Sequence, residues 1–277
     1  MNHVLDGFLD KLATMAEPKE DEYLGEDGLL HCSKCHTPRQ CRVNVQEREC
    51  IFPCICQCQK EAREAEKRRT EEAERRMYIQ RLKANGIQER HLLEWTFADA
   101  EDNRYIRMAK NYVENWKKVR EQNLGLLLWG DVGTGKSFLA ACIANALIER
   151  GTPVLMTNFS KILNQMGGMY SEERYRYIAS FSQFPLLVID DLGIERSTEY
   201  ALEQVYAVVD ERYKSGLPLL ITTNLTIDAI RNATDVAHAR IFSRVLEMCT
   251  PVHVAGCDRR TAIGKTKQEF VKEVLFQ

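Results

Sequence analysis

The sequence has no long apolar run. No part of its 277 residues approaches the roughly 20 consecutive apolar residues that a helix needs to cross a bilayer. The N-terminus also lacks a basic segment followed by an uninterrupted apolar stretch, which a secretory signal requires. We therefore expect neither a membrane-spanning helix nor an export signal, and we predict a soluble, cytoplasmic chain.

An excess of charge of either sign is also missing. Lysine and arginine number 38 against 40 aspartates and glutamates, which gives a formal net charge of -2 and a pI near 6.3. This balance excludes a globally basic coat for nucleic acid. Any contact with DNA is therefore expected in a local groove of an assembly.

Three segments of the chain differ in composition. Residues 1–59 are expected to form an N-terminal helix and a cysteine-rich module. Residues 60–89 are dense in glutamate, arginine and lysine, with pairs such as Glu64 and Arg68 at the i,i+4 spacing typical of an exposed helical linker. Residues 90–277 have the pattern of an α/β domain, and no internal repeat is visible.

The expected N-terminal helix carries one apolar stripe. A stripe of this kind needs a partner surface, which is either the cysteine module or another protein. Its members recur at helical spacing and are Val4, Leu5, Phe8, Leu9, Leu12 and Met15.

Cysteines are concentrated near the N-terminus. Seven of the ten lie between Cys32 and Cys58. In a chain without an export signal, such a cluster favours metal binding over disulfides. Cys32 and Cys35 form a C-x-x-C pair, and a second group of cysteines follows about twenty residues later.

Two separated pairs of thiolates can close a tetrahedral Zn²⁺ site and stabilise a segment too short for a core of its own. Three cysteines of the second group compete for two places, Cys41, Cys50 or His36 are further possibilities, and free buried cysteines are the alternative to zinc. The zinc ligand candidates are Cys32, Cys35, Cys54, Cys56 and Cys58.

The second half of the chain alternates short β-rich runs with helix-like segments. This alternation predicts a parallel sheet with helices on both faces. The expected strands are residues 125–129, 153–157, 185–190, 219–223 and 252–254.

A glycine-rich loop stands between the first expected strand and a helix-like segment that starts at Phe138. Its pattern is that of a P-loop, in which backbone amides face the phosphates of a nucleotide. Lys136 would add charge there, and the Ser137 hydroxyl would ligate Mg²⁺. The residues predicted to bind ATP are Gly130, Asp131, Val132, Gly133, Thr134, Gly135, Lys136, Ser137 and Phe138.

Polar residues follow two of the other expected strands. Asp190 and Asp191 end the run at 185–190, where an α/β sheet keeps its ligands. We predict Asp190 as a Mg²⁺ ligand and Asp191 as the group that polarises the attacking water. Asn224 follows the run at 219–223 and is the third polar group at a strand end, unless it only begins a turn.

Two arginines, Arg240 and Arg244, are spaced i,i+4 on an expected helix and therefore share one face. A pair of this kind suggests a phosphate ligand, and a surface ion pair is the alternative.

Residues 90–260 resemble the DnaC, DnaI and IstB-like group of AAA+ ATPases, on the P-loop, on residues 190–196, on 206–225 and on the Arg240 to Arg244 segment. The resemblance implies ATP hydrolysis with Lys136 and the strand-end acids. It also implies that Asn224 is sensor 1 and that Arg244 is an arginine finger which reaches a neighbouring subunit, with Arg240 as its helper.

The resemblance implies a role for one more residue, and the sequence departs from the family pattern at two points. Phe97 would help to form the entrance on the adenine side. Most AAA+ proteins carry glutamate where this chain has Asp191, so slow or partner-dependent hydrolysis is expected. A lid domain with a sensor 2 arginine is not evident, although Arg259 and Arg260 are candidates for that role.

The resemblance implies a DnaC-like helicase loader. Such a protein binds ATP and single-stranded DNA, self-associates through its arginine finger, and delivers a DnaB-type helicase that its N-terminal module holds. The alternatives are an IstB-like transposition helper and a zinc-dependent DNA-binding regulator that nucleotide switches.

Overall fold

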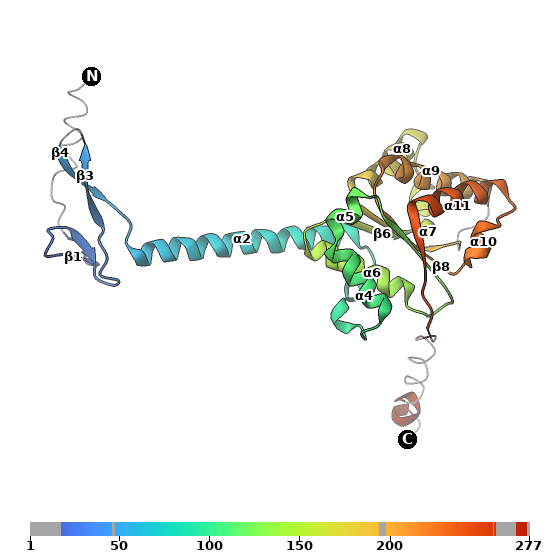
Figure 1. Ribbon diagram of the computed structural model, residues 1–277, viewed down its shortest axis with the longest axis horizontal. Coiled ribbons are helices and arrows are strands. Elements are labelled where there is room, and N and C mark those ends of the chain that lie inside the picture. Colours follow the sequence, from blue (N-terminus) through green and yellow to red (C-terminus); the bar gives the residue numbers. More distant parts are fainter. Residues whose placement is uncertain (1–17, 46–47, 194–197, 257, 259–269, 276–277) are drawn as a thin grey trace. The chain divides into compact units, whose positions relative to one another are not determined.

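The computed structural model describes residues 18–45, 48–193, 198–256, 258 and 270–275 (Figure 1). The expected N-terminal helix, residues 194–196, Arg259 and Arg260 lie outside the described residues. The chain divides into two compact units, Met1–Arg76 and Met77–Gln277. No helix of the described part is long and apolar enough to cross a membrane.

The first unit contains two antiparallel hairpins. β1 (Glu22–Leu24) pairs with β2 (Leu30–Cys32), and β3 (Gln40–Val45) pairs with β4 (Arg48–Pro53). Its buried apolar side chains in the described residues are few and comprise Leu29, Leu30, Cys32 and Cys56. A core this small needs an additional link for stability, such as a bound metal or a disulfide.

Helix α2 (Gln57–Gly86) covers most of the expected linker, and its charges pair along the helix, as Lys67 and Glu71 do at 3.8 Å. Its last turns belong to the second unit. Leu82 packs against the core there, and a side chain at Gly86 would collide with the Val154 carbonyl. The helix thus ends firmly on the α/β unit.

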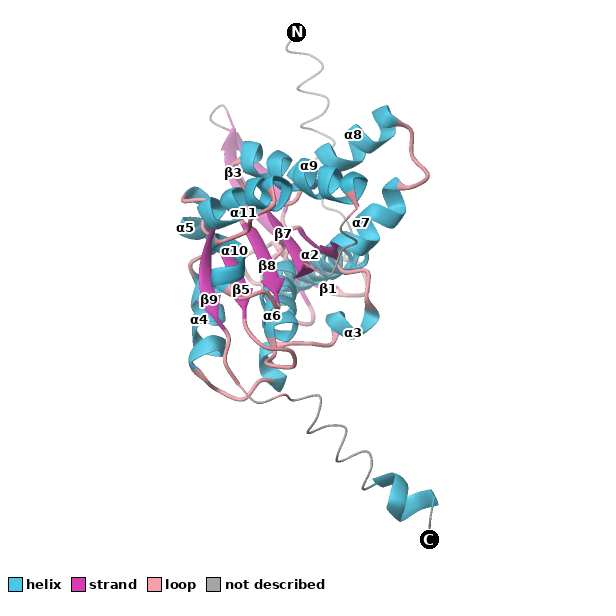
Figure 2. Ribbon diagram, turned by 90° about the vertical axis from the view of Figure 1, so that its right-hand side faces the viewer, coloured by secondary structure: helices cyan, strands magenta, loops and turns pink. Residues whose placement is uncertain are grey.

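The second unit is built on a five-stranded parallel sheet, in the order β6-β7-β8-β5-β9 (Figure 2). The prediction of a parallel sheet is confirmed. Its strands are β5 (Gly125–Trp129), β6 (Val154–Asn158), β7 (Leu186–Leu192), β8 (Leu219–Thr223) and β9 (Cys249–His253). β9 begins earlier than expected and includes Pro251, which a strand at the sheet edge tolerates.

Helices cover both faces of the sheet, as predicted, because side chains of each strand alternate between two cores. Leu126 and Leu128 of β5 enter one core and Leu127 enters the other. The first core packs against α3 (Arg90–Leu93), η1 (Phe97–Asp99), α4 (Arg104–Glu114), α5 (Trp116–Glu121) and α6 (Lys136–Glu149). The second packs against α7 (Phe159–Met166), α8 (Ser171–Ser180), η2 (Phe181–Gln183), α9 (Glu199–Ser215), α10 (Ile227–Arg231) and α11 (Val236–Met248).

Arg212 of α9 is buried, with 1% of its surface exposed. Its guanidinium donates hydrogen bonds to the backbone carbonyls of Phe181, Phe184, Pro185 and Pro218, at 2.5–3.3 Å. Burial lowers the pKa of Arg212 to about 10, so the side chain stays charged at neutral pH. The arginine therefore ties α9 to the segments that lead into β7 and β8.

Replacing Arg212 with methionine is expected to lower the free energy of unfolding by about 3–5 kcal/mol, because buried carbonyls lose their donors. Urea unfolding followed by circular dichroism measures this loss. The matched control is Lys214→Met on the same helix, because the exposed Lys214 contributes at most about 1 kcal/mol through its ion pair with Asp210. Equal losses in the two variants would contradict a structural role for Arg212.

Candidate nucleotide and metal sites

The P-loop, residues 130–137, connects β5 to α6. Gly133 and Gly135 have φ angles of +82° and +94°, a region that residues with a side chain rarely adopt. The Thr134 hydroxyl donates to the Asp131 carbonyl at 2.9 Å and closes the loop on itself. The glycines thereby turn successive amides towards one point at the N-terminus of α6, which suits a phosphate group.

Lys136 lies inside this loop, with 5% of its surface exposed. Its Nζ atom donates to the carbonyls of Gly130 at 2.9 Å and Asp131 at 2.7 Å. The ammonium is thus held at the N-terminal end of α6, where the helix dipole adds positive potential. The charge, the loop amides and the half-buried Ser137 at the helix start fit a nucleotide triphosphate with its Mg²⁺.

Asp190 and Asp191 occupy the carboxyl end of β7, as predicted. The Thr222 hydroxyl of β8 donates to Asp190 Oδ1 at 2.6 Å and accepts from the Asp191 backbone amide at 2.9 Å. Asp191 has a φ angle of +56°, unusual for a residue with a side chain. Thr222 has no predicted role in the sequence, because threonine in a strand run is typical of any strand.

The strand order brings the P-loop, the two acids and Asn224 to one edge of the sheet. β8 lies between β5, which leads into the P-loop, and β7, which ends in the acids. Asn224 follows β8 directly and is exposed. Because the strands are parallel, all three carboxyl ends meet at the same edge, so Asn224 follows the strand between the P-loop and the acids.

A hollow lies beside the P-loop, lined by Asn103, Tyr105, Ile106, Thr134, Gly135, Phe138, Leu139 and Val254. The Tyr105 hydroxyl accepts a hydrogen bond from the Ala255 amide at 2.9 Å, which joins α4 to the segment after β9. Phe97 packs in the first core, with Lys110 Nζ at 6.0 Å from its ring centre. No motif points to Tyr105, since the segment after β9 approaches it only in the fold.

Arg240 and Arg244 lie on α11, on the side of the sheet opposite α6. Both guanidinium groups stack on the Tyr206 ring of α9, at 4.6 and 4.7 Å from its centre. Arg244 Nε also donates to Asp210 at 2.9 Å. The predicted helix and the shared face are present, and the contacts described for both arginines are with α9 and α11.

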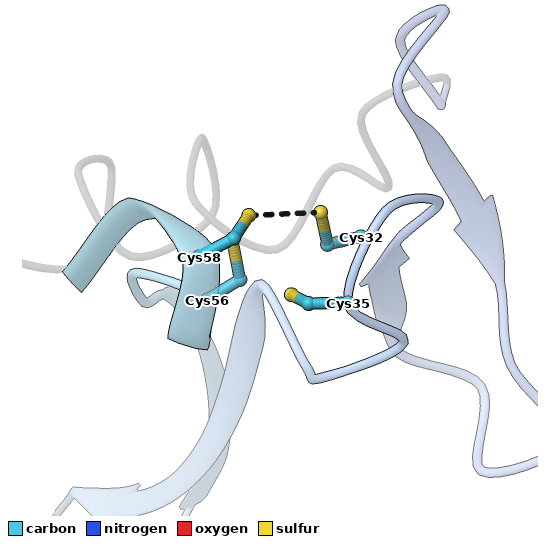
Figure 3. A group of neighbouring side chains, drawn as sticks. All are labelled: Cys32, Cys35, Cys56 and Cys58. Carbon is cyan, nitrogen blue, oxygen red and sulfur yellow. Dashed lines mark hydrogen bonds between the residues drawn. The ribbon is translucent and has the colours of Figure 1, made fainter. Parts of the chain in front are cut away.

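Four cysteines of the first unit form a cluster in which the Sγ atoms of Cys32, Cys35, Cys56 and Cys58 all lie within 4.8 Å of one another (Figure 3). Sγ of Cys58 is 3.6 Å from that of Cys32 and 3.3 Å from that of Cys56. A tetrahedral zinc ion with bonds of about 2.3 Å needs sulfur atoms about 3.8 Å apart, so small shifts of the four side chains accommodate it.

Cys54 is not part of this cluster. Its thiol donates to the Pro38 carbonyl at 3.5 Å. Among the described residues, Cys56 and Cys58 are the members of the second group that lie with Cys32 and Cys35. Cysteine spacing alone does not separate these candidates.

Surrounding groups shift the pKa values of the thiols in the cluster in opposite directions. Arg39 donates to Cys32 Sγ at 3.7 Å and is itself held by Asp21 and Glu22. The Thr37 hydroxyl lowers the pKa of Cys35 to about 5, whereas the adjacent Cys56 thiol raises the pKa of Cys58 to about 12. A bound metal cation would remove the rise in the pKa of Cys58, because a metal deprotonates its thiol ligands.

The fold, the P-loop and the strand-end acids define this protein's second unit as an ATP-binding domain with the AAA+ P-loop fold. Residues 59–266 match the family model described as "IstB-like ATP binding protein". The match covers more than half of the chain, so the chain belongs to this family.

Two relatives are replicative helicase loaders. The chain is 28% identical to DnaI of Bacillus subtilis (strain 168) over 197 residues, which cover 65% of this chain and 62% of the relative. It is 30% identical to DnaC of Escherichia coli (strain K12) over 146 residues, which cover 50% and 56%. The chain therefore spans less than two thirds of the length of either relative.

A crystal structure of DnaI has the same fold. Its TM-score to this chain is 0.51 at 24% sequence identity, and the match covers 61% of this chain and 96% of that one. The expected AAA+ core is thereby confirmed at the level of the fold.

Proposed function

We propose that this protein is an ATP-dependent replicative helicase loader. The observation that carries the proposal is a complete P-loop site on a chain similar to two proteins named as replicative helicase loaders. The four-cysteine module ahead of the ATPase unit supports it, because a separate module offers a surface for a partner.

In the proposed reaction, Lys136 and the loop amides bind the phosphates, while Ser137 and Asp190 hold Mg²⁺. When bound there, the ion would supply positive charge that neutralises the charge developing on the phosphates during hydrolysis. Asp191 orients the attacking water, and Asn224 contacts this water or the γ-phosphate. Arg244 of a second copy completes the site, so hydrolysis depends on self-association.

The partners follow from the same proposal. The cysteine module binds Zn²⁺ and holds a DnaB-type helicase, while assembled ATPase units line a groove for single-stranded DNA. Contacts to the DNA backbone would make this binding sensitive to salt. Hydrolysis then releases the helicase.

A second candidate is a transposition helper. The family model that residues 59–266 match is named after IstB-like proteins, and its motifs do not separate the two functions. In that case the partner is a transposase, and the DNA that is remodelled is duplex.

Affinity purification from the native host with Mg-ATP tests the proposal. We expect a replicative helicase to co-purify with the wild-type protein and about one zinc ion per chain. The Cys35→Ser variant should lose both the zinc and the helicase but still bind ATP. The matched control is Cys50→Ser, because Cys50 lies in the same module outside the cluster.

Capture of a transposase in place of a helicase would make the loader function wrong. Zinc loss without any effect on helicase capture would separate the metal from the docking role and contradict that part of the proposal.

A further inference from the structure

Thr222 is a fully buried side chain at the edge of the sheet where the acids lie. Its one hydroxyl makes two hydrogen bonds, to Asp190 Oδ1 at 2.6 Å and from the Asp191 amide at 2.9 Å. A single group on β8 therefore contacts both acids at the end of β7. The hydroxyl donates to the first and accepts from the second, so both of its capacities are used.

The pairing of β7 with β8 is irregular at this point. Ile189 pairs with Ile221 and Leu192 with Thr223, so two residues of β7, Asp190 and Asp191, lie opposite the single residue between them on β8. An extra residue in one strand is a β-bulge, which bends the strand and redirects its side chains.

The bulge places Asp191 in the left-handed region, at a φ angle of +56°. Aspartate and asparagine tolerate this region better than larger residues do. Such a conformation persists only where surrounding contacts hold it. Thr222 does so here, since its hydroxyl accepts a hydrogen bond from the Asp191 amide at 2.9 Å.

We propose that Thr222 is the positioning residue of the hydrolytic site. By donating to one carboxylate oxygen it fixes the rotamer of Asp190 and leaves the other oxygen for the metal. By holding the Asp191 amide it maintains the bulge that sets the direction of the second carboxylate. This inference rests on the proposed ATPase function and adds a residue to it.

The test compares Thr222→Val, which keeps the shape but lacks the hydroxyl, with Thr222→Ser, which keeps the hydroxyl. For Thr222→Val we expect kcat to fall about 10–100-fold with KM changed less than about 3-fold, as for other groups that orient metal ligands. Thr222→Ser should stay within about 3-fold of the wild type in both.

Two further measurements do not depend on hydrolysis. The Mg²⁺ concentration for half-maximal ATP binding should rise about tenfold or more in Thr222→Val, because Asp190 is no longer oriented. Amide hydrogen exchange at Asp191 should accelerate in the same variant, since its acceptor is gone.

Thr223→Val is the control for the loss of a buried hydroxyl from the same strand. Its hydroxyl bonds to the Leu192 carbonyl and the Leu225 amide, not to a carboxylate. It should lower the unfolding midpoint without changing the Mg²⁺ requirement.

The inference is wrong if Thr222→Val, folded as judged by its unfolding midpoint, keeps the wild-type kcat and Mg²⁺ requirement. It is also wrong if serine fails as valine does. Failure of the proposed function is a separate result, because in that case the wild-type protein itself would not hydrolyse ATP.

Discussion

Lys136→Ala is expected to remove ATP binding and to reduce ATP turnover by about 10²–10³-fold, the usual effect of losing one donor to developing charge. The ammonium lies inside the P-loop at the N-terminus of α6, where the phosphates of a nucleotide would bind. Fluorescence titration with labelled ATP and a phosphate-release assay measure the two effects.

The control for this variant is Lys118→Ala, which removes an exposed lysine of α5 and should leave both quantities unchanged. Lys136→Arg retains the charge but not its position, and it should resemble the alanine variant in turnover. ATP binding by Lys136→Ala with wild-type affinity would contradict the assignment of the phosphate site.

Arg244→Ala is expected to reduce turnover of the assembled protein by about 10³-fold, while a single subunit binds ATP as before. The contacts described for Arg244 are with α9 and its own helix, so its effect should come from a neighbouring copy. Asp210 stays neutralised in the variant, because Lys214 contacts it at 2.7 Å. Steady-state hydrolysis and ATP affinity measure the separation.

Mixing the two inactive variants gives a sharper test. An Arg244→Ala subunit has an intact P-loop, and a Lys136→Ala subunit has an intact arginine. In an equal mixture about one quarter of head-to-tail interfaces pair these two intact halves. Activity should therefore reappear on mixing.

The control for Arg244→Ala is Arg231→Ala, which removes an exposed arginine of α10 and should leave turnover unchanged. Mixtures that stay inactive would count against an active site shared between subunits, as would full activity of Arg244→Ala alone.

Local sequence was sufficient for much of the fold. The P-loop was predictable because its glycines, lysine and serine stand between an apolar strand and a helix. The parallel sheet was predictable because its strands are short and buried on both faces. β9 was the least well predicted, since Pro251 is atypical of a strand and is tolerated only at the sheet edge.

The candidate site was predictable only in part. Asp190 and Asp191 stand out because acids at the carboxyl end of a buried strand lie where an α/β sheet keeps its ligands. Thr222, by contrast, resembles any strand threonine. Its role comes from a bulge in the neighbouring strand, a feature of pairing between segments more than thirty residues apart. The buried Arg212 was likewise hidden, because an arginine near a helix end is typical of the surface.

Local sequence identifies the chemical groups and their immediate setting: a phosphate loop at a helix start, acids at a strand end, paired arginines on one helix face, and a cluster of thiols. Which groups meet depends on the folded chain, which joins the acids with Thr222, Arg212 with four carbonyls, and Cys56 and Cys58 rather than Cys54 with Cys32 and Cys35. Periodicity and motif spacing reflect interactions within a few residues, whereas strand register and chain direction at a turn depend on how distant segments pack.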